Sequence, residues 1–106
     1  MLQNPHFVYI TTNLTKSVLY SGSTPFFIQR ITEHYLNRGN QKSFAGRYHA
    51  FYLIYFEEID NHYNALSREY QIKSWSRQKK VSLINEMNPE WKFLNEEIFE
   101  EWLPMD

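Results

Sequence analysis

The sequence predicts an α+β domain, a three-stranded antiparallel sheet flanked by helices, in the order β-β-α-β-α-α. Two β-branched and aromatic segments lie close together near the start of the chain. A continuous apolar run of strand length follows at residues 51–56, and helix-capping residues precede the predicted helices. We expect the 106 residues to form one domain over residues 1–94, with an acidic tail over residues 95–106 packed on that domain.

The first two strands are predicted to form a hairpin. Residues 7–11 (Phe-Val-Tyr-Ile-Thr) and residues 18–21 (Val-Leu-Tyr-Ser) have the composition of strands, and Gly22 is expected to end the second. Residues 12–17 between them are polar and turn-like, so they predict a long hairpin loop.

A helix is predicted next, with Thr24 as its N-cap and Pro25 as its first residue. Residues 37–39 are expected to stop it, after apolar residues at helical spacing: Phe27, Ile28, Ile31 and Tyr35. Residues 40–46 are predicted to be a polar loop. The run at residues 51–56 is predicted to be a central strand, because it is apolar on both faces.

Two further helices and a short acidic one complete the prediction. Asp60 or Asn61 caps the first, whose inner side is expected to carry Ala65, Leu66, Ile72 and Trp75. Ser76 caps the second, which is expected to extend to about Met87, because the Pro of Asn88-Pro89 cannot continue a helix. Residues 95–102 are predicted to form one or two acidic helical turns.

Charge is distributed unevenly along the chain. The net charge of −1 argues against a nucleic-acid binder when the chain is taken whole. Residues 1–80, however, contain ten basic and five acidic residues, whereas residues 81–106 contain one basic and seven acidic residues. A basic body with an acidic tail is therefore compatible with a nucleic-acid partner, and we expect the tail to pack away from the active face.

Several function classes are excluded or disfavoured. The chain has no cysteine, which excludes disulfides, thiolate metal sites and a cysteine nucleophile. No apolar run approaches the roughly 20 residues needed to span a bilayer. The N-terminus lacks the pattern of a signal peptide, so a cytoplasmic location is expected.

Glu69 is the first candidate for chemistry, because its helical spacing from Ala65 and Ile72 places it on or beside an inward face. A carboxylate there must be paired, solvated or bound to a cation. A salt bridge to Arg68, Lys73 or a residue of another helix is the commoner outcome. A single carboxylate is also a frequent protein ligand of Mg²⁺, which keeps most of its waters.

Two further pairs have chemically useful side chains. Arg30 and His34 are four residues apart and project side by side from a helix, where Arg suits a phosphoryl oxygen and His can move a proton. A solvated helix edge would have the same pattern. Tyr9 and Tyr20 lie on the two hairpin strands, where they are either core residues or phenols that accept a proton from water.

Basic residues between positions 38 and 80 alternate with aromatic ones, a composition that suits a phosphate backbone with stacked bases. Ordinary solvated helix faces would also account for it. The candidates for nucleic-acid binding are Arg38, Lys42, Arg47, Lys73, Arg77, Lys79 and Lys80.

These signals occur together in a particular order. The motifs are Val8-Tyr9-Ile10, Leu19-Tyr20-Ser21-Gly22, Arg30 with His34, Glu69 within residues 65–73, and Asn88-Pro89-Glu90-Trp91. In this set the chain resembles the GIY-YIG nuclease family over about residues 6–94, and in particular its small stand-alone bacterial members. The first motif has Val8 in place of the opening Gly, and the second has Ser21 where Ile or Val is usual.

The resemblance implies a divalent-metal-dependent endonuclease. Tyr9 or Tyr20 would activate a water, Arg30 would stabilise the pentavalent phosphate, and His34 would assist proton transfer. Glu69 would be the one protein ligand of a single Mg²⁺ or Mn²⁺ ion. Two residues are expected to support the site: Asn88 and Tyr48.

The expected function is therefore hydrolysis of DNA phosphodiester bonds with low sequence specificity, in repair or turnover, on substrates that include branched or single-stranded DNA. No membrane partner is expected. The alternative is a module of the same fold that binds nucleic acid or protein without turnover. The complete set of candidate catalytic residues favours the enzyme, because a binding module needs no metal ligand.

Overall fold

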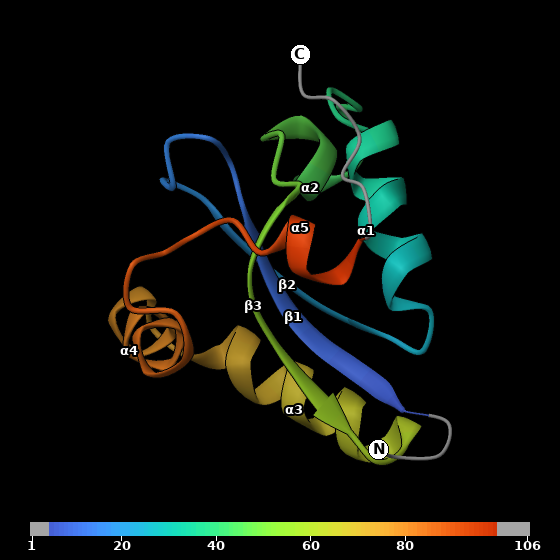
Figure 1. Cartoon of the computed structure of the whole chain (residues 1–106), viewed down its shortest axis with the longest axis vertical. Helices are drawn as coiled ribbons and strands as arrows, with labels where there is room; N and C mark the ends of the chain where they lie inside the picture. Colours follow the sequence, from blue (N-terminus) through green and yellow to red (C-terminus); the bar gives the residue numbers. More distant parts are fainter. Residues whose placement is uncertain (1–4, 100–106) are drawn as a thin grey trace.

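The fold follows the predicted order of its main elements, with one additional one-turn helix over residues 44–47 (Figure 1). The structure is a computed structural model that describes residues 5–99. Its elements are β1 (His6–Thr12), β2 (Leu19–Thr24), α1 (Phe27–Leu36), α2 (Phe44–Arg47), β3 (Tyr52–Ile59), α3 (His62–Ser74), α4 (Arg77–Met87) and α5 (Asn95–Ile98). Within the described part of the chain, no helix is both long and apolar enough to cross a membrane.

The sheet is antiparallel with the strand order β2-β1-β3, so β1 is the central strand. Its Tyr9 lies opposite Gly22 of β2 on one side and Phe56 of β3 on the other. The prediction that the apolar run at residues 51–56 forms a central strand is wrong. Both faces of β3 are apolar because helices cover them, although the strand itself lies at an edge.

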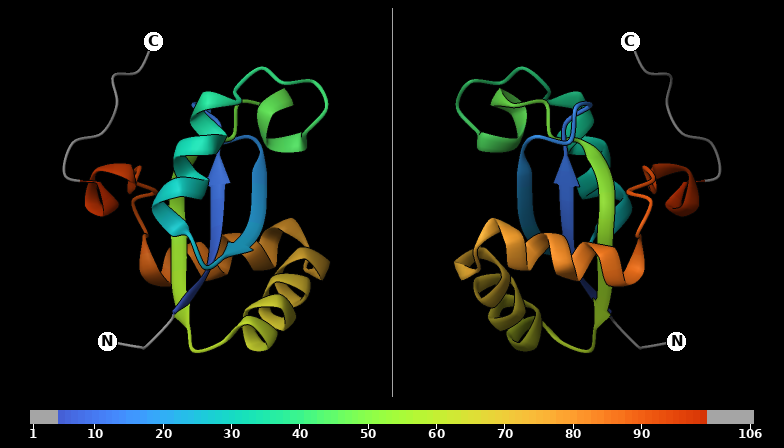
Figure 2. Two further views of the ribbon diagram at one scale, coloured as in Figure 1. Left: turned by 90° about the vertical axis from the view of Figure 1, so that its right-hand side faces the viewer. Right: turned by 90° about the vertical axis from the view of Figure 1, so that its left-hand side faces the viewer.

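Helices cover both faces of the sheet and divide the core into two clusters. Figure 2 shows α1 on one face and α4 on the opposite face. On the α4 side, Val8 and Ile10 pack with residues of α3 and α4 such as Ile72 and Ile84. On the α1 side, Tyr9 packs with Phe27, Ile31, Leu53 and Leu94. The alternation of side chains along β1 therefore directs Tyr9 towards α1.

The outer edge of β3 is bonded to the segment after α4. The Asn95 side chain accepts a hydrogen bond from the Leu53 N–H (2.9 Å) and donates to the Phe51 carbonyl (3.1 Å). The Leu94 N–H donates to the Leu53 carbonyl (2.6 Å), and the Asn88 amide donates to the Ile54 carbonyl (2.9 Å). Backbone groups of residues 51–54, which the first part of an edge strand would otherwise expose, are thus satisfied within the protein.

Two predicted helix starts are confirmed, and in both the capping side chain bonds a backbone N–H three residues ahead. Asn61 and Ser76 cap α3 and α4 with their side chains, as predicted, and α4 ends at Met87. The predicted start of α1 is wrong: Thr24 is the last residue of β2, and its hydroxyl accepts a hydrogen bond from the Phe26 N–H (2.9 Å).

Three smaller expectations also need correction. The end of the loop predicted at residues 40–46 is instead helical: residues 44–47 form α2, capped by Ser43. Leu66, predicted on the inner side of α3, is exposed because Ala65 and Ile72 define the face that packs on the sheet. The acidic turn predicted at residues 95–102 forms only as far as Ile98, and residues 100–102 lie outside the described residues.

Candidate active site

Tyr9, Tyr20 and His34 form one aromatic cluster between the sheet and α1. The Tyr9 hydroxyl and Nε2 of His34 share a hydrogen bond of 2.7 Å. The His34 ring lies 5.7 Å from the Tyr9 ring and 5.2 Å from the Tyr20 ring, and the two tyrosine rings are 6.4 Å apart. The structure therefore brings together three candidates from three different elements.

Gly22 makes room for this cluster. A Cβ atom at this position would lie 2.6 Å from the Tyr9 hydroxyl oxygen and 2.8 Å from its Cζ. Both distances are shorter than real Cβ contacts allow, and Tyr9 is only 1% exposed, so its ring has little room to move. Glycine at position 22 thus lets the Tyr9 hydroxyl reach His34.

Burial sets the protonation states in the cluster. It raises the pKa of Tyr9 far above its usual value, and the charges of Tyr20 and Glu69 raise it further while that of Arg30 lowers it. Burial also lowers the pKa of His34 to about 4, with a further lowering by the nearby Arg30 charge. At neutral pH the imidazole is therefore neutral and Tyr9 keeps its proton.

A polar pocket of about 190 Å³ opens beside this cluster, between α1, β2 and α2. Tyr20, His34 and Arg30 all line it, so three candidates share one space. Arg30 is half-exposed, and its guanidinium lies 3.5 Å from Glu33 of the same helix. Such an exposed pair is weak, so the guanidinium can also bind an anion that enters the pocket.

Glu69 lies on α3 with a side chain that is 13% exposed. Its Oε1 accepts a hydrogen bond from the Ser23 hydroxyl of β2, and its Oε2 is 2.6 Å from the ammonium of Lys73. The salt bridge to Lys73 is thus present, as one of the sequence interpretations had it. The charge of Glu69 acts on the Tyr9 hydroxyl, so the carboxylate is electrostatically coupled to the cluster.

The donor set fits a divalent ion that keeps most of its water. Within residues 5–99, no group of three or more His, Cys, Asp or Glu is placed to hold a metal. A lone carboxylate with an adjacent hydroxyl, here Glu69 and Ser23, is a set of hard oxygen donors of the kind that Mg²⁺ accepts. The Lys73 ammonium would have to share or release Glu69.

Comparison with known proteins shows the family to which the chain belongs. The family model described as the GIY-YIG catalytic domain matches residues 5–82 of the chain. The chain belongs to the GIY-YIG family. Similar UPF0213 proteins occur in Staphylococcus aureus strains Mu3, Mu50 and COL; each is 37% identical over 81 residues, covering 76% of this chain and 95% of the relative. No solved structure matches the chain.

Membership of the GIY-YIG family places the chain in a nuclease superfamily. It implies a nucleic-acid substrate and, in general, the use of divalent metal ions. The small size of the matched relatives agrees with a stand-alone GIY-YIG protein. The names of these relatives state no activity, so the assignment of roles to residues depends on the site itself.

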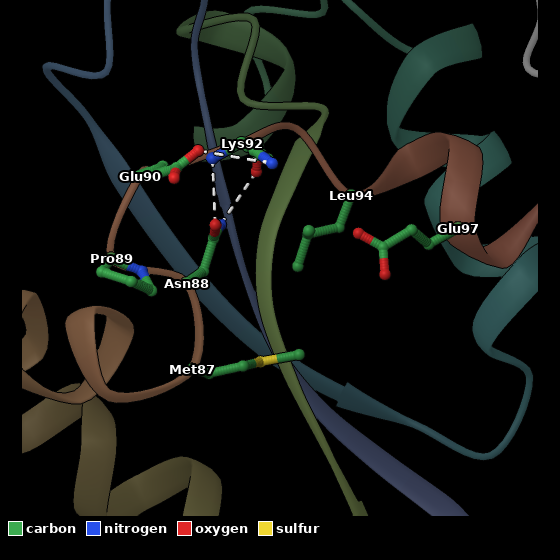
Figure 3. Close-up of a pocket in the computed structure, with 7 residues that line it drawn as sticks. All are labelled: Met87, Asn88, Pro89, Glu90, Lys92, Leu94 and Glu97. Carbon is green, nitrogen blue, oxygen red and sulfur yellow. Dashed lines mark hydrogen bonds and ion pairs between the residues drawn. The ribbon is translucent and has the colours of Figure 1, made fainter.

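Of the two predicted supporting residues, Asn88 borders a separate pocket, whereas Tyr48 packs on Phe44, which in turn packs on Tyr20. The Asn88 amide donates to the Lys92 carbonyl and accepts from the Lys92 N–H (3.0 Å), which fixes the turn after α4 (Figure 3). It also donates to the Ile54 carbonyl. Asn88 borders a separate pocket of about 260 Å³ that Glu97 also lines. Tyr48 follows α2, where the centre of its ring lies 4.9 Å from the centre of the Phe44 ring.

The predicted nucleic-acid-binding residues of the GIY-YIG domain are dispersed. Arg38 lies over the Tyr35 ring, Arg47 over Tyr48 and Lys79 over Trp75. Arg77 donates to the carbonyls of Lys16 and Ser17, and Lys73 pairs with Glu69. Lys80 and Arg77 line one pocket next to α2, and Lys42 is exposed before the same helix.

Acidic residues of the tail were expected to lie away from this site. Glu97 of α5 lines the pocket beside Asn88, whereas the pocket that contains Arg30 is lined by residues of β2, α1 and α2 and of the turns beside those helices. Glu100 and Glu101 lie outside the described residues.

Sequence reasoning missed three residues that shape the site. It expected Gly22 to end the second strand, whereas the residue lies within β2 and makes room for the Tyr9 hydroxyl. It gave no role to Ser23, which bonds Glu69, or to Phe44, which packs on Tyr20. The role of Gly22 could have been predicted from the hairpin register, because that register pairs Gly22 with Tyr9.

Proposed function

We propose that the protein is a divalent-metal-dependent endonuclease that hydrolyses DNA phosphodiester bonds with low sequence specificity, in the cytoplasm, in repair or turnover. The observation that carries the proposal is the shared pocket of Tyr20, His34 and Arg30, beside the buried Tyr9 hydroxyl. A proton acceptor, a cation for the phosphate and a neutral imidazole thus lie at one place, as phosphodiester hydrolysis requires.

Tyr20 is the better candidate for contact with the attacking water. It lines the pocket, whereas Tyr9 is buried and its raised pKa disfavours the phenolate. Tyr9 instead orients His34 through their hydrogen bond. A bound phosphodiester would raise the pKa of His34, because its negative charge stabilises the imidazolium, and His34 could then hold the proton that leaves the water.

Arg30 and Glu69 supply the charged groups that would bind the phosphate and the metal ion. The Arg30 guanidinium can donate two hydrogen bonds to a phosphoryl oxygen pair and offset the negative charge that develops there. Glu69, with the Ser23 hydroxyl beside it, would hold the metal ion. When bound, such an ion neutralises charge on the phosphoryl oxygen and the leaving oxygen.

The test compares the wild type with Glu69→Gln and Glu86→Gln on labelled single-stranded, duplex and branched DNA in Mg²⁺ or Mn²⁺. Glu86 is an exposed acid of α4 and serves as the matched control. We expect cleavage by the wild type and Glu86→Gln and at least a 100-fold loss in Glu69→Gln. Cleavage that survives Glu69→Gln would contradict the metal-ligand role.

A binding module without turnover is the second candidate, and the Lys73 ammonium on Glu69 favours it, because that cation already neutralises the carboxylate. DNA binding without cleavage by the wild type, at any divalent ion concentration, would support this candidate over the nuclease.

A further inference from the structure

Phe44 forms a wall between two pockets. On one side lies the pocket of about 190 Å³ that contains Tyr20 and Arg30. On the other side lies a pocket of about 270 Å³ that contains Arg77 and Lys80. Phe44 is 49% exposed although it is a large apolar residue, so it is partly open to solvent where the two pockets meet.

The ring of Phe44 continues the aromatic cluster of the candidate active site. It stacks on Tyr20 with ring centres 6.2 Å apart and an interplanar angle of 25°. The ring centre of Tyr48, a residue that is 41% exposed, lies 4.9 Å from that of Phe44, and the two rings are tilted by 50°. A row of aromatic rings therefore runs from the candidate catalytic tyrosine to the surface.

The short helix that presents Phe44 is held firmly. The Ser43 side chain accepts a hydrogen bond from the Gly46 N–H (3.0 Å), and the Gly46 carbonyl accepts one from the Gly39 N–H (2.7 Å). A Cβ at Gly46 would lie 2.6 Å from the Asn37 carbonyl oxygen, so α2 packs closely against the end of α1. The backbone that presents the ring is thus held in place, which lowers the entropy cost of binding.

The second pocket is cationic. Arg77 is anchored by hydrogen bonds of 3.1 Å to the carbonyls of Lys16 and Ser17, and Lys80 lies one turn further along α4. Among the described residues that line this pocket there is no acid. Its chemistry suits a phosphate group and is complementary to the charge of a nucleic-acid backbone.

We propose that Phe44 is a stacking site for one unpaired DNA base next to the scissile phosphate, and that Arg77 and Lys80 bind the neighbouring phosphate. A base inside a duplex has both faces covered by its neighbours, so only an unpaired nucleotide can offer a face to Phe44. The position relative to the scissile bond rests on the proposed function, but the binding site itself does not.

The test measures affinity by fluorescence anisotropy, without divalent metal, for two labelled strands of equal length. One is ordinary single-stranded DNA and the other is an abasic strand with the same phosphates. The variants are Phe44→Ala, Phe44→Trp, and the control Tyr63→Ala, which removes an aromatic ring that is 72% exposed at the start of α3. Thermal denaturation checks that each variant is folded.

We expect Phe44→Ala to weaken binding of the ordinary strand about tenfold and to leave binding of the abasic strand unchanged. Phe44→Trp should restore the affinity, because an indole also stacks, and Tyr63→Ala should match the wild type. Lys80→Gln should weaken both strands equally and reduce the salt slope by about 0.7.

Equal loss on both strands in a folded Phe44→Ala protein, or no loss on either, would overturn the stacking site. So would failure of Phe44→Trp to restore affinity. The outcome is independent of the nuclease proposal: a wild type that shows this binding pattern but never cleaves DNA refutes the nuclease and retains the stacking site.

Discussion

The ammonium of Lys73 lies 2.6 Å from Oε2 of Glu69, one helical turn earlier on α3. The hydrogen bond to Glu69 raises the pKa of Lys73, so the lysine stays charged at neutral pH. The same ammonium lies 6.0 Å from the centre of the Tyr20 ring. The carboxylate proposed to hold a metal thus has a positive partner within the chain, beside a candidate catalytic residue.

This pairing predicts that removal of the lysine charge strengthens metal binding. Lys73→Met should raise the affinity for Mn²⁺ about five- to tenfold, because the ion no longer competes with an ammonium for Glu69. Isothermal titration calorimetry, or the electron paramagnetic resonance signal of free Mn²⁺, measures this affinity, and Lys79→Met is the control. An unchanged Mn²⁺ affinity in Lys73→Met would show that the ion does not bind at Glu69.

The close approach at Gly22 predicts a steric cost. Gly22→Ala should lower the free energy of unfolding by about 1–3 kcal/mol, because its Cβ would overlap the Tyr9 ring end. Tyr9→Phe removes the nearest atom, so the double variant Tyr9→Phe/Gly22→Ala should lose less stability than the two single losses combined. Urea denaturation of the four proteins measures the coupling, and strict additivity would argue against the clash.

His34 predicts a pH-dependent stability with a defined sign. Its pKa is lowered in the folded protein to about 4 from 6.5, so the unfolded chain binds more protons below pH 6.5. The free energy of unfolding should therefore fall as the pH decreases from about 6.5 to 4, by at most about 3 kcal/mol from this residue. His34→Gln should have a flatter profile over that range, and identical profiles would contradict the assignment.

The hydrogen bonds of the buried Asn95 side chain predict a large loss of stability when that side chain is removed. Asn95→Ala would leave the Leu53 N–H and the Phe51 carbonyl without their partner, at a cost of about 2–4 kcal/mol in the free energy of unfolding. The exposed Asn64 is the matched control, since Asn64→Ala should cost well under 1 kcal/mol. Chemical denaturation of both variants would show whether the two costs differ as expected.

Local interactions explain why much of the fold was predictable. The caps at Asn61 and Ser76 depend on hydrogen bonds to residues three positions ahead, so the sequence contains both partners. The same cue failed at Thr24, because pairing with Phe7 across the hairpin places that residue in β2. The apolar run of β3 was ambiguous, since an edge strand covered by helices has the same composition as a central one.

The candidate site likewise combines local features that the sequence predicts with long-range contacts that it does not predict. Spacing alone places Arg30 and His34 side by side on α1, and the pocket between α1 and α2 contains both. The hydrogen bond from Ser23 to Glu69 joins residues 46 positions apart, and no local pattern in the sequence indicates it. Contacts of that range depend on how α3 docks on the hairpin, which only the tertiary structure determines.

The asparagines that bond the outer side of β3 have a consequence for solubility. The match to the family model ends at residue 82 of this chain, so Asn88, Leu94 and Asn95 lie beyond the matched region. Without them, β3 would present a free apolar edge to other molecules, which is a template for intermolecular strand pairing and aggregation. The segment after α4 thus acts as a built-in guard against self-association, and chains cut back to Met87, the last residue of α4, should precipitate as their concentration rises.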